Sequence, residues 1–163
     1  MREEILLLRR IRFWLTLFVI GLVLSGVTAF PLETELRWVV RVTDGQGWLR
    51  GSGVSVWLHT VEGALIETNA KYPFMAYGTD WLAFAHLVIA LVFIEVWRDP
   101  VRNKWVIACG LMACVAVVPL AVIAGGVRGI PVFWRMVDCS FGVLGVVPLW
   151  VCWRAVGELE RLG

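Results

Sequence analysis

Charged residues are scarce in this chain. Only 17% of its 163 residues are Asp, Glu, Lys or Arg, whereas 60% are hydrophobic, and the mean hydropathy is +0.79. Soluble globular domains carry about 25% charged residues, so this composition excludes an ordinary soluble domain. The net charge of +2 is spread along the chain and not gathered into a basic patch, which argues against nucleic-acid binding.

Several motifs of catalysis and transport are also missing. The sequence has no P-loop, no nucleophile elbow and no H-E-x-x-H motif, and no pair of carboxylates lies in the middle of an apolar stretch. It has no internal repeat of the kind that builds transporter halves. The four cysteines form no C-x-x-C motif and all lie within apolar stretches; they are Cys109, Cys114, Cys139 and Cys152. We therefore expect them to be buried packing residues and not a redox pair.

Long apolar runs are the main feature that is present. A hydrocarbon core about 30 Å thick requires roughly 20 apolar residues per helix. Four stretches meet this requirement, namely residues 13–30, 81–97, 105–124 and 132–153. The first ends like a signal-peptide cleavage site, but it is longer than a signal core, so we expect a retained anchor. The sequence predicts an all-α membrane protein with a single four-helix transmembrane domain over residues 1–163.

The distribution of basic residues predicts the orientation. Residues 2–12 contain four arginines, and the loop between the second and third runs contains Arg98, Arg102 and Lys104. The next loop offers only Arg128 and Arg135. Because short basic loops stay in the cytoplasm, we expect both termini to be cytoplasmic, in a multi-pass protein of the plasma membrane or a bacterial inner membrane.

The segment between the first two runs, residues 31–79, is then an outer cap. A loop of that length usually has structure of its own. In its second half, Trp57, Val61 and Leu65 recur every four residues, which predicts an amphipathic helix lying along the membrane surface. Ser52 or Ser55 is expected to be its N-cap.

The polar residues of the second span lie at different depths. Asp80 is the expected N-cap of that span, and Glu95, near its cytoplasmic end, is expected to pair with Arg98. His86 lies about 9 Å along the helix from Asp80. We expect it to face the protein interior, because an ionisable group that faces lipid is costly.

In the predicted orientation, several ionisable groups gather near the outer membrane face. These candidate site residues are Asp80, His86, Arg128, Arg135, Asp138, Glu33 and Glu35. Two hypotheses account for them. In the first they form a structural network, in which Arg135 pairs with Asp138 and His86 bonds Asp138 or a loop carbonyl. Arg128 would then pair with Glu33 or Glu35. In the second they line an outward-opening pocket for an amphiphile such as a lipid or quinone.

The two histidines raise the question of a haem or a metal. His59 and His86 are both expected on the outer side, where Glu62 or Asp80 would complete a metal site. No H-x-x-x-H, C-x-x-C-H or E-x-x-H spacing supports such a site. We therefore expect His59 to meet interfacial water beside Glu62.

Pairs of small residues predict close helix packing in three of the spans. They are Gly21 with Ser25 in the first span and Gly110 with Cys114 in the third, and the fourth has a small-residue face of Ser140, Gly142 and Gly145. A compact bundle with an outer cap follows from this pattern, and the same faces would also accept a partner helix.

Together these features favour a non-catalytic protein, an accessory or scaffolding subunit of a larger membrane complex. Its expected partners are the lipid bilayer and other membrane protein subunits. The alternative is a membrane-embedded enzyme or a lipid- or quinone-binding protein with an outward-facing polar pocket. A cavity at the polar cluster would favour the alternative, and a filled network of ion pairs would favour the subunit.

Overall fold

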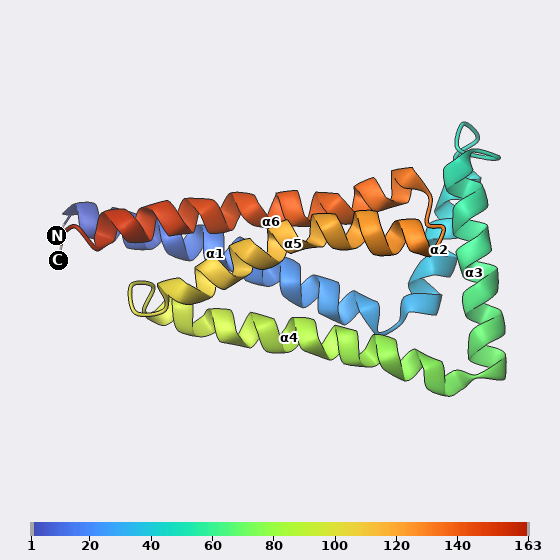
Figure 1. Ribbon diagram of the computed structural model, residues 1–163, viewed down its shortest axis with the longest axis horizontal. Coiled ribbons are helices and arrows are strands. Elements are labelled where there is room, and N and C mark those ends of the chain that lie inside the picture. The colour runs from blue at the N-terminus through green and yellow to red at the C-terminus, as the bar shows by residue number, and fades with distance from the viewer. Residues whose placement is uncertain (1, 163) are drawn as a thin grey trace. The chain divides into compact units, whose positions relative to one another are not determined.

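The computed structural model describes residues 2–162, which form six α-helices, one short 3₁₀-helix and no strand (Figure 1). They are α1 (Arg2–Ala29), α2 (Leu32–Gly45), α3 (Gly53–Lys71), η1 (Pro73–Met75), α4 (Ala76–Arg98), α5 (Lys104–Val127) and α6 (Val132–Leu159). Four of them, α1, α4 with η1, α5 and α6, are long and apolar enough to cross a membrane. The predicted all-helical chain with four candidate spans is confirmed.

The helices group into two compact units. Unit 1 holds the chain up to Leu22 and from Ile89 onward, and unit 2 holds Val23–Val88. The helices α1 and α4 are therefore divided between the units, with most of α1 in unit 1 and α4 split near its middle. Unit 1 contains α5 and α6, and unit 2 contains α2, α3 and η1.

The core of unit 1 forms where four helix segments meet. It lies between the first half of α1, the end of α4, the start of α5 and the end of α6. Its most deeply buried large side chains are Ile11, Leu15, Val96, Ile107, Leu149, Cys152 and Val156. Since Cys152 is fully buried in this apolar core, the prediction that it is a packing residue is confirmed. Cys114 and Cys139 are half-buried, and the prediction of burial is wrong for Cys109, which is exposed among the described residues.

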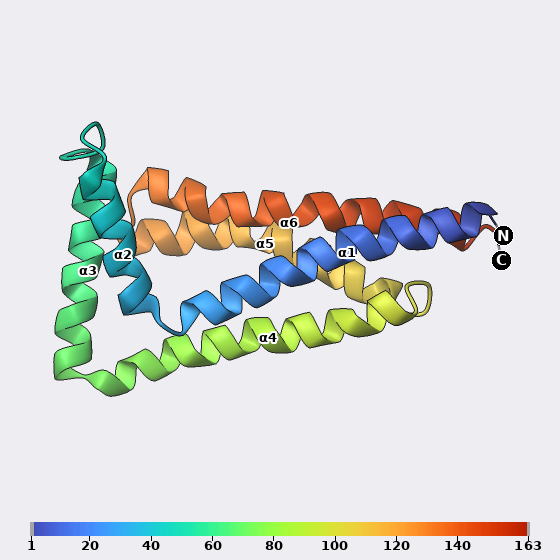
Figure 2. The same cartoon turned by 180° about the vertical axis from the view of Figure 1, so that it is seen from behind.

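Glycines let α5 and α6 pack closely, and Figures 1 and 2 show the two helices side by side toward the loop that joins them. A Cβ added at Gly142 would lie 2.5 Å from the Cys114 carbonyl oxygen, and one at Gly145 would lie 2.7 Å from Cys114 Sγ. The predicted small-residue contact between these spans is confirmed. A Cβ added at Gly21 would meet no other helix of the described residues within 4 Å, so the predicted close packing at Gly21 is not found between these helices.

Basic side chains at one end of unit 1 pack against tryptophans. The Arg12 guanidinium lies 4.8 Å from the ring centre of Trp97, and Lys104 Nζ lies 4.7 Å from that of Trp153. Lys104 also forms an ion pair with Glu160. These contacts bind α1 to α4 and α5 to α6 at the end where α1 and α5 begin.

Most of the helices extend beyond the apolar runs that predicted them. The second span begins at Ala76, directly after η1, so Asp80 lies in the second turn of α4 and its expected role as N-cap is wrong. The helix starts early because Pro73 begins η1 with a fixed φ. Thr79 then donates its hydroxyl hydrogen to the Ala76 carbonyl within the first turn of α4.

Unit 2 contains a helical hairpin, with α2 and α3 side by side in both views (Figure 2). The expected helix in the second half of the loop is α3, and Ser52 is its N-cap, since Ser52 Oγ accepts from the Ser55 amide at 3.3 Å. The sequence-based prediction missed α2. Val40 of α2 and Leu58 of α3 are buried in the hairpin.

Candidate functional site

The hairpin of unit 2 is held by polar contacts at both of its ends. Near the turn, Asp44 Oδ1 lies 3.1 Å from His59 Nε2 and 3.5 Å from Ser55 Oγ. At the other end, Asn69 Nδ2 donates to Glu33 Oε2 at 2.7 Å, and the other Glu33 oxygen accepts from Arg37. These contacts fix Glu33 where the hairpin meets the end of α1 and the start of α4.

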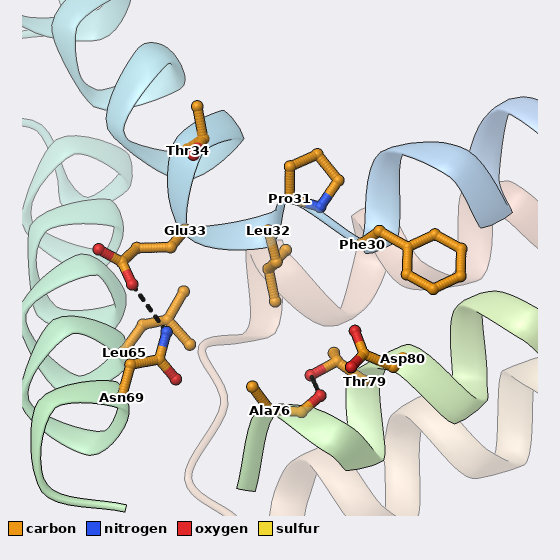
Figure 3. A pocket seen from close by; sticks show the side chains of 10 residues that line it. All are labelled: Phe30, Pro31, Leu32, Glu33, Thr34, Leu65, Asn69, Ala76, Thr79 and Asp80. Atoms are coloured by element: carbon orange, nitrogen blue, oxygen red, sulfur yellow. Dashed lines mark hydrogen bonds between the residues drawn. The ribbon is translucent and has the colours of Figure 1, made fainter. Parts of the chain in front are cut away.

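A pocket of about 240 Å³ lies at this junction (Figure 3). Its walls come from the end of α1, the start of α2, the end of α3 and the start of α4. The side chains that matter most for its chemistry are Phe30, Leu32, Glu33, Leu65, Asn69 and Asp80. We call this the acidic pocket, because its lining contains two carboxylates and no Lys, Arg or His.

The acidic pocket contains more hydrogen-bond acceptors than donors. Asp80 has no hydrogen bond or ion pair to any side chain in residues 2–162, and it extends from the α4 side in Figure 3. Asn69 uses its amide hydrogens on Glu33, which leaves Asn69 Oδ1 buried without a partner among the described residues. The Thr79 hydroxyl already donates to Ala76. The pocket is therefore suited to a group that donates hydrogen bonds and carries positive charge.

A second pocket of about 260 Å³ adjoins the first and shares Phe30 and Asp80 with it. Its other lining residues are the aromatic side chains of Tyr77, Trp81 and Phe84, which follow one face of α4. Successive rings pack edge to face with centres 6.0 Å apart. We call this the aromatic groove. It provides an apolar surface directly beside the acidic pocket.

No protein family model, curated protein or solved structure matches this chain. The site residues that the sequence-based prediction missed are Asn69, Phe30 and the three α4 aromatics. An aromatic spacing of four and then three residues, Tyr77 to Trp81 to Phe84, is the signal that would have indicated the groove.

Four of the predicted site residues lie in unit 2. Glu33 and Asp80 are brought together in the acidic pocket. Glu35 is half-buried on α2 but does not line that pocket. His86 lies on α4, and its Nδ1 is 2.8 Å from the carbonyl oxygen of Leu82, one turn earlier. The acceptor for His86 is thus a carbonyl of its own helix.

The other three predicted site residues lie in unit 1. Arg128 is exposed at the C-terminal end of α5, and Asp138 is half-buried on α6. Arg135 lies along Gly125 and donates to the Val122 carbonyl at 3.4 Å. The predicted ion pair between Arg135 and Asp138 is wrong, because the glycine leaves room for the arginine to lie across α5.

Two further sequence-based predictions concern His59 and Glu95. His59 Nδ1 lies 3.7 Å from Glu62 on the same helix, while its other nitrogen faces Asp44. Within residues 2–162, no group of three His, Cys, Asp or Glu side chains is arranged to hold a metal ion. The expected pair of Glu95 with Arg98 is confirmed, with 2.8 Å between their nitrogen and oxygen atoms.

Proposed function

We propose that this chain is an accessory or scaffolding subunit of a larger complex in the plasma membrane or a bacterial inner membrane. Both termini would be cytoplasmic, and the α2–α3 hairpin would form an outer cap that contacts another membrane protein subunit. The four candidate spans provide the membrane anchor.

The cytoplasmic orientation is supported by the basic end of unit 1. The start of α1, the end of α4, the start of α5 and the end of α6 contribute to one core, so they lie on the same side of unit 1. Arg12, Arg98 and Lys104 belong to these segments. Because Lys and Arg are retained on the cytoplasmic side, this end is proposed to face the cytoplasm.

The observation that carries the subunit proposal is an exposed apolar stripe on α2. Val40 and Thr43 are buried in the hairpin, but Trp38, Val39 and Val42 are 65%, 37% and 43% exposed. The stripe lies on a helix outside the four candidate spans. Exposed apolar patches of this kind mark interaction sites, and tryptophan is enriched among the residues that dominate interface energies.

Purification from native membranes in mild detergent tests this proposal. We expect a membrane protein subunit to co-purify in stoichiometric amount with the wild-type chain. A Trp38→Ser and Val42→Ser double variant should lose it, while Val56→Ser, an exposed valine on α3, should retain it. If the double variant retains the subunit but binds lipid vesicles more weakly than the wild-type protein, the stripe lies on lipid. A subunit retained equally by both variants would contradict the proposed surface.

The two adjoining pockets favour a second candidate function, the binding of an amphiphile. A polar pocket continuous with an aromatic groove matches a molecule that has a polar head and an apolar tail. A lipid or a quinone belongs to this class. Both functions are compatible, because a bound lipid can stabilise the cap of a membrane subunit.

A further inference from the structure

We propose that the acidic pocket binds the ammonium head group of phosphatidylethanolamine, with one acyl chain in the aromatic groove. This inference rests on the second candidate function and specifies its ligand. The head group and the chain would meet at Phe30 and Asp80, which line both spaces.

The charge of the acidic pocket selects a cation. Glu33 is already balanced by Arg37, but Asp80 has no charged partner in residues 2–162. The lining therefore has one carboxylate that is not neutralised. Asp80 is partly buried, and a partly buried carboxylate is stabilised by a nearby positive charge or by strong hydrogen-bond donors. A single ammonium group provides both.

The hydrogen-bonding pattern of the pocket selects a primary amine. A primary ammonium has three N–H donors, and the pocket offers acceptors in Asp80, in Asn69 Oδ1 and in the remaining lone pairs of Glu33. A buried acceptor without a hydrogen-bond partner destabilises the protein, and an N–H donor from a ligand removes that cost. A trimethylammonium group has no N–H donor and leaves Asn69 Oδ1 unpaired.

The same pattern disfavours a quinone and an anionic lipid. The polar atoms of a quinone ring are carbonyl oxygens, which are acceptors and would face the acceptors of Asp80 and Asn69. Phosphatidylglycerol has no positive charge in its head group to offset the Asp80 carboxylate, and its net charge is negative. Phosphatidylethanolamine keeps its phosphate one ethylene unit away from its ammonium.

The dimensions of the two spaces fit this ligand. The pocket volume of about 240 Å³ is several times the volume of about 30 Å³ that one water occupies in the liquid. It can therefore hold the three heavy atoms of an aminoethyl group. The aromatic groove adds about 260 Å³ along exposed rings of Tyr77, Trp81 and Phe84. Tryptophan and tyrosine prefer the level of the lipid head groups, which is where the head and the first part of an acyl chain lie.

The test measures lipid retention by native mass spectrometry on the purified, delipidated full-length protein. The protein is titrated with phosphatidylethanolamine, phosphatidylcholine and phosphatidylglycerol that have identical acyl chains, and separately with a quinone. We expect phosphatidylethanolamine to bind at least about tenfold more tightly than the other two lipids, since only its head group can form charge-assisted hydrogen bonds with the pocket.

Four variants locate the binding site. Asp80→Asn and Glu33→Gln should each weaken phosphatidylethanolamine binding, with a loss of about tenfold for Asp80→Asn. Glu35→Gln is the matched control, because it removes one carboxylate from α2 outside the pocket and should leave binding unchanged. Trp81→Ala should weaken the binding of every diacyl lipid. Since Trp81 is 57% exposed, this variant should fold even if Asp80→Asn does not.

The outcomes separate this inference from the function on which it rests. Equal binding of phosphatidylcholine and phosphatidylethanolamine, weakened by Trp81→Ala, would overturn the ammonium head group and retain amphiphile binding. Preference for phosphatidylglycerol or a quinone would also overturn the ammonium head group as the ligand and retain amphiphile binding. If none of these amphiphiles binds, both proposals fail. A phosphatidylethanolamine preference that survives Asp80→Asn and Glu33→Gln would overturn the pocket as its location.

Discussion

The close approach of α5 and α6 at Gly142 leads to a prediction about stability. A Cβ at this position would lie 2.5 Å from the Cys114 carbonyl oxygen. An ordinary C···O contact is about 3.3–3.6 Å, so the two helices would have to separate by about 1 Å. A backbone carbonyl cannot rotate away as a side chain can. Gly142→Ala should therefore open the interface that joins the two helices.

The magnitude follows from two opposing terms. Overpacking a well-filled interface costs about 1–3 kcal/mol, and the helix preference of Ala over Gly returns about 1 kcal/mol. We expect Gly142→Ala to lower the free energy of unfolding by about 1–2 kcal/mol. Gly21→Ala is the matched control, because nothing lies within 4 Å of its added Cβ. It should gain up to about 1 kcal/mol.

A second pair of variants separates a backbone clash from a side-chain clash. At Gly145 the added Cβ would lie 2.7 Å from Cys114 Sγ, and that sulfur can be removed. Cys114→Ala should therefore relieve Gly145→Ala and leave the cost of Gly142→Ala unchanged. Reversible unfolding in mixed micelles, followed by circular dichroism, measures both double-mutant cycles.

Two results would refute this reasoning. If Gly142→Ala is as stable as Gly21→Ala, the two helices do not approach each other as closely as the contact indicates. If Cys114→Ala rescues Gly142→Ala as fully as it rescues Gly145→Ala, the clash at residue 142 is with a side chain and not with the backbone.

Three further predictions concern the orientation, a helix cap and an ion pair. In a variant without native cysteines, a cysteine at Asn103 should be labelled from the cytoplasm and one at Gln46 from outside; the opposite pattern would reverse the proposed orientation. Ser52→Ala should cost about 1 kcal/mol through loss of the α3 cap, seen as faster amide exchange in the first turn of α3, whereas unchanged exchange would mean that the cap is not needed. Lys104 and Glu160 are only partly exposed, so a Lys104→Met and Glu160→Gln cycle should give a coupling of about 0.2–1 kcal/mol, and strict additivity would show that the pair does not interact.

The four candidate membrane spans were predictable because length and hydropathy are properties of a continuous stretch of sequence. Their ends were not. Hydropathy reports which residues can contact lipid, whereas a helix continues past the hydrocarbon wherever its side chains are solvated. This is why α1 begins at Arg2 and α4 begins at Ala76, each several residues before its apolar run.

The helix α2 was missed for a different reason. Its charged residues recur through LETELRWVVRVTDG and mask the apolar positions. Leu36, Val40 and Thr43 are spaced four and then three residues apart, which is the period of one helix face. That signal was present in the sequence, and Val40 and Thr43 are the residues of α2 that the structure buries.

The candidate site was only partly predictable because it depends on the hairpin. Glu33 and Asp80 were identified from their positions next to two spans. Asn69 was not, because it reaches Glu33 only after the chain has turned back over 36 residues. A polar residue with an ordinary sequence environment gains its role from such a tertiary contact.

The partners of the charged groups explain why the Asp80 carboxylate matters more for ligand binding than the other charged groups of the candidate site. A network of ion pairs would satisfy every charge at once, yet Arg135 lies across glycine and bonds a carbonyl, while Glu33 is paired with Arg37 on its own helix. Asp80 is left in a pocket with acceptors around it and without a cation. Glu33→Gln would leave the Arg37 guanidinium without its carboxylate partner, so this variant would also remove an ion pair of the hairpin. Asp80→Asn changes the charge of the acidic pocket without breaking a side-chain contact, and it should therefore abolish ammonium selectivity with little effect on the stability of the fold.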